Sequence, residues 1–217
     1  MMGEMASRPP GRSVKIGEDE RTGWSSDRPR RQGAPVRPAD LTVHCSVLRP
    51  ADRLRYSPGS LLIVSCASTE QLDAFVERLV EERSAVFSLR KVKGLLAGRV
   101  AEEDLDERAS ELLLAAVAKR MENRQTVVLE TGGFTPQERE PFLRAAAAQR
   151  RPRHLILIET ARELVGEEDL APLNELRRAL DAGELGNEGV QTALRLGGGS
   201  AAEVKRILFR PPPREED

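Results

Sequence analysis

The sequence predicts an α/β domain, a three-layer sandwich in which helices cover both faces of a mainly parallel, five-stranded sheet. Two observations predict this class. Short runs of consecutive apolar residues recur along the chain, which is typical of strands that are buried on both faces. Stretches with apolar residues at helical spacing separate these runs, and strands that alternate with helices form parallel sheets.

The expected elements follow this alternation. The five strands are expected at residues 61–65, 85–89, 126–130, 154–160 and 206–209, and residues 41–48 form an edge strand or a lead-in. Helices are expected at 69–82, at 101–123 with a buried face of Leu105, Leu112, Leu113, Ala116 and Val117, at 136–150, and at 161–194 with breaks at Gly183 and Gly186. The third helix has the clearest start, because Thr135, Pro136 and Glu138 match a capping box with proline in the first turn.

Composition limits the classes of protein to which the chain can belong. Of its 217 residues 39% are apolar but only 3% aromatic, so Leu, Val, Ala and Ile must build the core. The net charge of −1 argues against binding nucleic acid through bulk electrostatics. Residues 1–40 hold five prolines, eight basic and six acidic residues, which predicts a disordered arm that could contact nucleic acid or an acidic partner. The folded domain is expected at 41–210 and a flexible tail at 211–217.

Cysteine usage and hydropathy predict the compartment. Cys45 and Cys66 are the two cysteines, and the N-terminus lacks the apolar run of a secretory leader. No apolar stretch reaches the roughly 20 residues that cross a bilayer. We therefore expect a reduced, cytoplasmic protein without a membrane segment. Two cysteines and two histidines without ligand spacing predict no metal site, and we expect no cofactor.

Two stretches carry a resemblance to a known family. TVVLETGGFTPQER (126–139) and HLILIET (154–160) follow a strand, a short loop and a helix at residues 61–82. This order resembles the P-loop kinases of the AAA family that include polynucleotide-kinase-like and zeta-toxin-like proteins. The resemblance spans residues 58–162 and implies a P-loop NTPase-like fold.

The resemblance places the phosphate loop, G-x-x-x-x-G-K-[ST], on residues 66–73. Cys66 and Gln71 then stand in the glycine positions, Leu72 in that of the lysine and Asp73 in that of the magnesium-binding hydroxyl, with Thr69 inside the loop. Each replacement removes a function: backbone curvature around phosphate, neutralisation of its charge, and metal binding. A carboxylate about 4 Å from a phosphate charge costs roughly 4 kcal/mol at an effective dielectric constant near 20.

Two further family positions are changed. Arg90 stands on or beside the position of the general base, and Glu130 stands where the third strand carries an aspartate. The resemblance therefore implies a pseudokinase with a degenerate Walker A loop and no catalytic residue, which binds ATP weakly or not at all. It would act in binding or regulation with a protein partner that the sequence does not identify. We also expect Asp73 or Thr69 to cap the helix that follows the loop.

Three alternatives remain open. The first is an ATP-binding nucleotide or polynucleotide kinase whose non-standard phosphate site uses basic side chains from the set Arg90, Lys91, Lys93, Arg162, Arg177 and Arg178. The second is an enzyme with Cys66 as nucleophile at a helix N-terminus. The third is a scaffold that docks a partner through the amphipathic segments 106–121 and 163–186.

Overall fold

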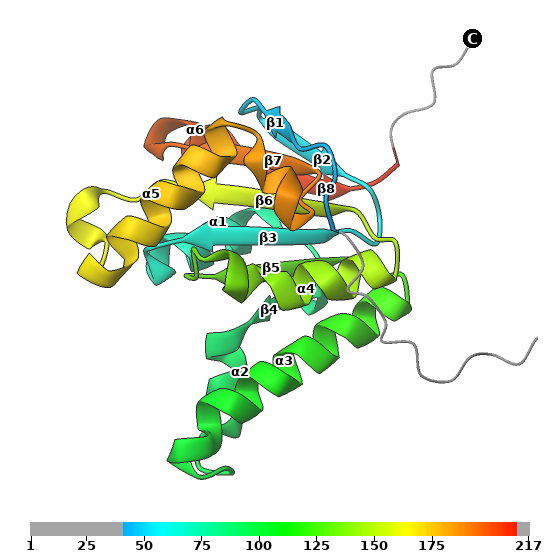
Figure 1. Cartoon of the computed structure of the whole chain (residues 1–217), viewed down its shortest axis with the longest axis vertical. Helices are drawn as coiled ribbons and strands as arrows, with labels where there is room; N and C mark the ends of the chain where they lie inside the picture. Colours follow the sequence, from blue (N-terminus) through cyan, green and yellow to red (C-terminus); the bar gives the residue numbers. More distant parts are fainter. Residues whose placement is uncertain (1–40, 212–217) are drawn as a thin grey trace, which may run out of the picture. The chain divides into compact units, whose positions relative to one another are not determined.

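The computed structural model describes residues 41–211. The predictions for residues 1–40 and for the segment 212–217 lie outside the described residues. The main sheet has the strand order β1-β7-β6-β3-β5-β4, and all neighbouring strands in it are parallel (Figure 1). In chain order its strands are β1 (Ser46–Leu48), β3 (Leu61–Cys66), β4 (Val86–Ser88), β5 (Val127–Thr131), β6 (Arg153–Ile158) and β7 (Thr192–Leu196).

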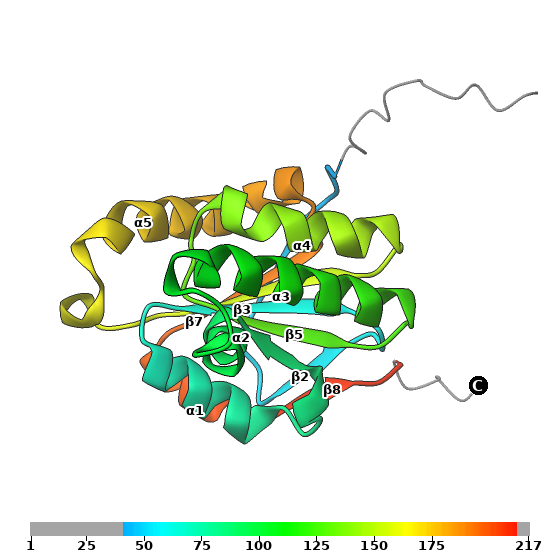
Figure 2. The same cartoon turned by 90° about the horizontal axis from the view of Figure 1, so that it is seen from below.

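Helices cover this sheet on both faces. The α-helices of the described residues are α1 (Thr69–Leu79), α2 (Leu89–Leu96), α3 (Leu105–Glu122), α4 (Pro136–Ala148), α5 (Glu167–Asp181) and α6 (Gly198–Glu203). Helices α3, α4 and α5 lie on one face, and α1 lies on the other together with a small parallel sheet of β2 (Arg53–Tyr56) and β8 (Arg206–Phe209) (Figure 2). The predicted three-layer α/β class with a parallel sheet is confirmed.

The predicted number of strands was wrong: the main sheet has six. The expected strand at 206–209 exists, but it pairs with β2 and does not join the main sheet. The main sheet contains two other strands instead. They are β7, which begins in a region that we expected to be helical, and β1, which lies in the segment 41–48 where we expected an edge strand or a lead-in. The two strands that the sequence analysis did not predict, β7 and β2, are short and contain arginine: β7 carries Arg195, and in β2 the exposed Arg53 and Arg55 alternate with buried residues.

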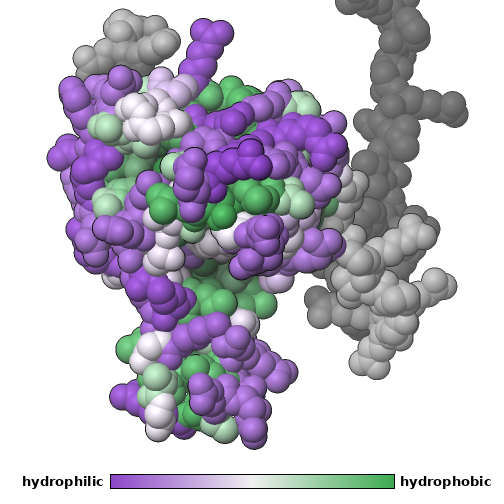
Figure 3. Space-filling model, turned by 90° about the vertical axis from the view of Figure 1, so that its left-hand side faces the viewer, coloured by the Kyte–Doolittle hydropathy of each residue, from purple (hydrophilic) through white to green (hydrophobic). Residues whose placement is uncertain are grey.

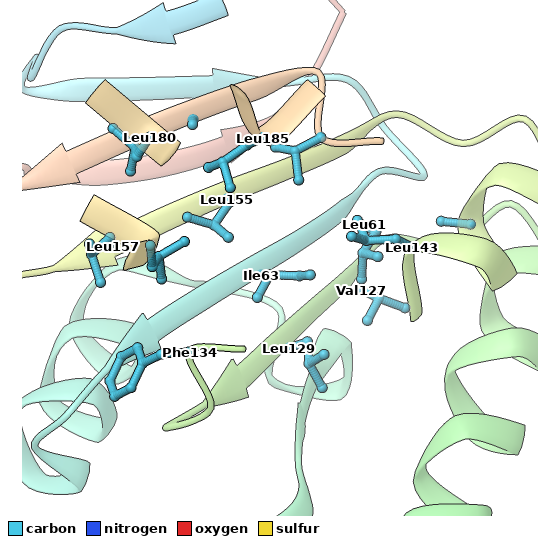
Figure 4. Close-up of a cluster of buried hydrophobic side chains, with 14 of the residues drawn as sticks. Leu61, Ile63, Val127, Leu129, Phe134, Leu143, Leu155, Leu157, Leu180 and Leu185 are labelled. Atoms are coloured by element: carbon cyan, nitrogen blue, oxygen red, sulfur yellow. The ribbon is translucent and has the colours of Figure 1, made fainter. Parts of the chain in front are cut away.

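The central strand β3 supplies both cores. Its side chains alternate, so that Leu61 and Ile63 belong to the cluster beneath α3, α4 and α5, whereas Leu62 and Val64 belong to the cluster beneath α1. All four are fully buried. Figure 4 shows the first cluster, in which side chains of β3, β5 and β6 lie together with Leu143 of α4 and Leu180 of α5.

The start of α4 agrees with the sequence. The backbone N–H of Thr135 donates to the Glu138 carboxylate at 2.9 Å, and the N–H of Glu138 donates to the Thr135 hydroxyl at 3.4 Å, as the capping box requires. The predicted buried face of α3 needs a correction. Leu112 is 48% exposed, and the buried side chains are Ala109, Leu113, Val117 and Met121 at a spacing of four residues.

A buried histidine links the main sheet to the small sheet. His154 of β6 stacks against Tyr56 of β2 with ring centroids 4.6 Å apart, and its Nδ1 lies 2.8 Å from the Thr192 hydroxyl. Its Nε2 is buried without a hydrogen-bond partner within residues 41–211. Burial, with a smaller effect of the Arg153 charge, lowers the pKa of His154 from 6.5 to about 4.

We expect this histidine to make stability depend on pH. Its pKa is lower in the folded state than in the unfolded state, so the unfolded chain binds the extra proton first as the pH falls below 6.5. The free energy of unfolding should therefore decrease by about 2 kcal/mol between about pH 7.5 and about pH 5. Urea denaturation at both pH values measures this difference.

The chain provides a matched control for this prediction. His154→Gln should remove most of the difference between the two pH values, whereas His44→Gln, at the other histidine, which is exposed, should preserve it. An equal pH dependence in the two variants would contradict the assignment to His154.

Candidate functional site

The carboxyl ends of β3, β4, β5 and β6 define the edge where a ligand is expected. From β3 the chain continues to β4 and β5, which both lie on one side of β3 in the sheet. It then passes from β5 to β6, which lies on the other side of β3. Ligands of open α/β sheets bind at the carboxyl ends of strands where the connections change direction in this way. Figure 3 looks onto this edge, with the lobe formed by α2 and the start of α3 at its lower end.

The connection from β3 to α1 is short. Strand β3 ends at Cys66 and α1 begins at Thr69, so Ala67 and Ser68 are the whole connection. Ser68 is the N-cap, and its hydroxyl accepts a hydrogen bond from the backbone N–H of Gln71 at 3.3 Å. The prediction that Asp73 or Thr69 caps this helix was wrong, because a cap stands directly before the first helical residue and both lie inside the helix.

The residue in the lysine position belongs to the core. Leu72 is buried on the inner face of α1 together with Phe75, Val76 and Leu79. Its backbone N–H donates to the Ser68 carbonyl at 3.0 Å in the first turn of the helix. The side chain therefore stabilises the packing of α1 on the sheet, and it has no polar atom with which to bind phosphate.

Cys66 and Gln71 meet the end of β6. The Cys66 thiol lies 3.2 Å from the Thr160 hydroxyl, which donates to the Gln71 side-chain oxygen at 3.2 Å. The sequence analysis gave Thr160 no role in the site, although this residue ends the expected strand 154–160 and therefore lies at this edge. His154 lies four residues before Ile158, the partner of Cys66 in the sheet, and therefore about 13 Å away along the strand, so it provides no base for a Cys66 nucleophile.

Helix α2 lies next to this edge and is held by ion pairs. The sequence did not predict α2, which has no fully buried residue and begins directly after β4. Arg90 pairs with Asp73 of α1 at 2.5 Å, Lys91 with Glu130 of β5 at 2.8 Å, and Lys93 with Asp106 of α3 at 2.7 Å. Two predicted site residues, Arg90 and Asp73, are thus each other's partners.

A pocket of about 390 Å³ opens between α1, α2 and the carboxyl end of β5. Five of the seven predicted site residues line it, whereas Cys66 and Gln71 lie beside it. The lining residues are Thr69, Leu72, Asp73, Ser88, Leu89, Arg90, Lys93, Glu130, Thr131, Gly132, Gly133 and Glu138. In Figure 3, apolar and weakly polar side chains show at the waist between the α2–α3 lobe and the body of the domain.

Glu130 is the most buried charged side chain of this pocket. The residue is 4% exposed, and its Oε2 accepts from Lys91. Its Oε1 is buried and has no hydrogen-bond partner within the described part of the chain. A buried carboxylate oxygen without a donor is costly, and Glu130 shares this lack of a partner with the Ser65 hydroxyl at the end of β3.

A second charged cluster lies at the end of β6. Glu159 accepts hydrogen bonds from Arg177 of α5 and Arg195 of β7, and Arg195 also pairs with Asp181 at 2.9 Å. Burial would raise the pKa of the Glu159 carboxyl, but hydrogen bonds from the two arginines outweigh burial and hold this pKa below its ordinary value. Arg177 therefore ties α5 to the sheet.

Two other site classes find no support in residues 41–211. No group of three or more His, Cys, Asp and Glu side chains there could hold a metal ion. In the same range no helix is both long and apolar enough to cross a membrane.

Comparison with known proteins adds little. No protein-family model and no curated protein matches the chain. Among solved structures, the chain is similar to a protein of Chloroflexus aurantiacus J-10-fl described as a "putative kinase". The sequence identity is 12%, the TM-score is 0.41, and the match covers 65% of this chain and 89% of that one. A likeness of this size carries no argument about function.

The ion pairs of α2 lead to a salt-dependent prediction. Raising the salt concentration from about 0.01 M to about 1 M shortens the screening length from about 30 Å to about 3 Å, which weakens exposed pairs. Amide hydrogen exchange in α2 should therefore accelerate at least about threefold relative to α1, which buries four apolar side chains.

Asp73→Asn provides the matched variant, because it removes one of the three pairs without touching the core. It should reproduce part of the acceleration at low salt. Equal exchange of α2 relative to α1 at both salt concentrations would contradict the conclusion that charge holds this helix.

Proposed function

We propose that the protein is a P-loop-kinase-like protein that does not transfer phosphate and acts in binding or regulation. The observation that carries the proposal is the two-residue connection between β3 and α1. A phosphate loop surrounds its ligand with several successive backbone N–H groups, and a lysine reaches the outer phosphates. Here the N–H groups of Gln71 and Leu72 bond to Ser68, and a leucine stands in the lysine position.

The charges at this edge support the same proposal. Glu70 lies in the first turn of α1 and supplies the negative charge that a helix N-terminus attracts. Asp73 stands where the family carries a metal-binding hydroxyl, and its carboxylate pairs with Arg90. A triphosphate at this position would meet both carboxylates without a lysine to offset them.

The alternative function is an ATP-binding nucleotide or polynucleotide kinase with a non-standard phosphate site. Arg90 and Lys93 favour it, because both line the pocket. Against it, Arg90, Lys93 and Arg177 each pair with a carboxylate of the domain.

Calorimetric titration with Mg²⁺-ATP separates the two functions. We expect a dissociation constant no better than about 1 mM, an affinity of about 4 kcal/mol, because the cradle, the lysine and the hydroxyl are absent. A micromolar affinity would overturn the proposal in favour of the kinase.

Arg90→Gln sharpens this titration. In the kinase alternative Arg90 holds phosphate, so the variant should bind ATP at least about tenfold more weakly. In the proposed function the variant should show the same lack of binding as the unmodified protein. Cooperative thermal unfolding of both proteins establishes that they are folded.

A further inference from the structure

The Glu130 carboxylate is only partly hydrogen-bonded, and a protein that has lost phosphate transfer does not need such a group. One carboxylate oxygen, Oε2, is paired with Lys91, whereas Oε1 is buried without a donor within the described residues. The same side chain lines the pocket between α1, α2 and β5. An acceptor that is kept from water and left unpaired costs stability, and a ligand with a donor group would remove this cost.

The charges around Glu130 determine which donor suits it. Lys91 already balances the charge of Glu130 at 2.8 Å, so an ammonium group at Oε1 would add a second positive charge close to Lys91. An anion would face Glu130, Asp73 and Glu138 in the lining, while Arg90 and Lys93 are already paired. A neutral hydroxyl donates to Oε1 without either penalty.

The remaining lining fits a small polar molecule. Gly132 and Gly133 follow β5 and present backbone rather than side chains to the pocket, and Ser88 and Thr131 contribute hydroxyl groups. A volume of about 390 Å³ is in the range of small-molecule sites. Eight of the twelve lining residues are polar or charged, and Leu72 and Leu89 supply the apolar wall.

We propose that this pocket binds an uncharged small molecule with several hydroxyl groups, of the sugar or polyol class, that donates an O–H to Oε1 of Glu130. The proposal rests on the proposed function in one respect, namely that the edge does not hold a triphosphate. It deepens that function by assigning the class of molecule that the domain binds.

Helix α2 controls access to the acceptor. Oε1 is closed off from solvent, and Lys91 of α2 lies over the carboxylate. Helix α2 is joined to the rest of the domain by three ion pairs and by Leu89 and Val92, which are partly buried and pack against the core. Binding through Oε1 therefore requires a shift of α2 that opens this oxygen to the pocket.

Titration with simple probes, followed by backbone amide NMR, tests the proposal. The probes are myo-inositol and D-glucose, which are uncharged, with inorganic phosphate and propylammonium as charged counterparts. We expect saturable shifts at Gly132, Gly133 and Lys91 with at least one uncharged probe, at the roughly millimolar affinity of a ligand with about a dozen heavy atoms. The charged probes should give no saturable shift there.

Two variants connect the shifts to the pocket. Glu130→Met keeps the length of the side chain and removes both oxygens, so it should weaken binding at least about tenfold. Glu111→Met, on the exposed surface of α3, should leave binding unchanged. If Glu130→Met does not fold, Gly132→Leu provides the test, because a Cβ there would meet only Cys66 O at 3.7 Å while the longer side chain fills the pocket.

Three results would overturn the proposal: no saturable shift with either uncharged probe up to about 0.1 M, stronger binding of phosphate or propylammonium than of both polyols, or binding that survives both Glu130→Met and Gly132→Leu. These results are distinct from failure of the proposed function, which is decided by Mg²⁺-ATP alone. Polyol binding without ATP binding supports both proposals.

Discussion

The burial of β3 on both faces is the constraint on which the rest of the domain depends. Leu61 and Ile63 require a helical layer on one side, and Leu62 and Val64 require another on the other side. Each fully buried aliphatic side chain stabilises the fold by about 1.5–3 kcal/mol, so neither layer can be absent. Because helices cover both faces, ligands are left with the edge where the strands end.

The elements with a local pattern of buried residues could be predicted from the sequence. Ion pairs between residues far apart in the sequence could not. Strands β3, β5 and β6 each contain a run of consecutive apolar residues. The N-terminal cap of α4 is formed by Thr135 and Glu138, which are only three residues apart in the sequence. Strand β7 escaped prediction because Arg195 interrupts its apolar residues Ala193, Leu194 and Leu196, whereas the apolar residues of β3, β5 and β6 are consecutive. That arginine is accommodated by Glu159, 36 residues away, which no local pattern reveals.

The same distinction applies to the candidate site. The resemblance to the P-loop kinases placed Asp73, Arg90 and Glu130 in one site, and all three line the same pocket. The partners could not be predicted: Arg90 with Asp73 and Lys91 with Glu130 depend on how α2 turns after β4. Helix α2 has only partly buried apolar residues, Leu89 and Val92, and its eight residues are too few for a clear helical periodicity in the sequence.

The position of Glu130 indicates that the pocket is more than the remnant of a phosphate site. Along β5 the residues before it, Val127 to Leu129, are apolar and buried, and an apolar residue at 130 would continue that pattern. Replacing a buried ion pair with apolar side chains is often neutral or stabilising, so packing alone does not require a carboxylate there. Its free oxygen is buried beside the pocket at the edge where the strands end, and a donor from outside the domain that reached it would satisfy it.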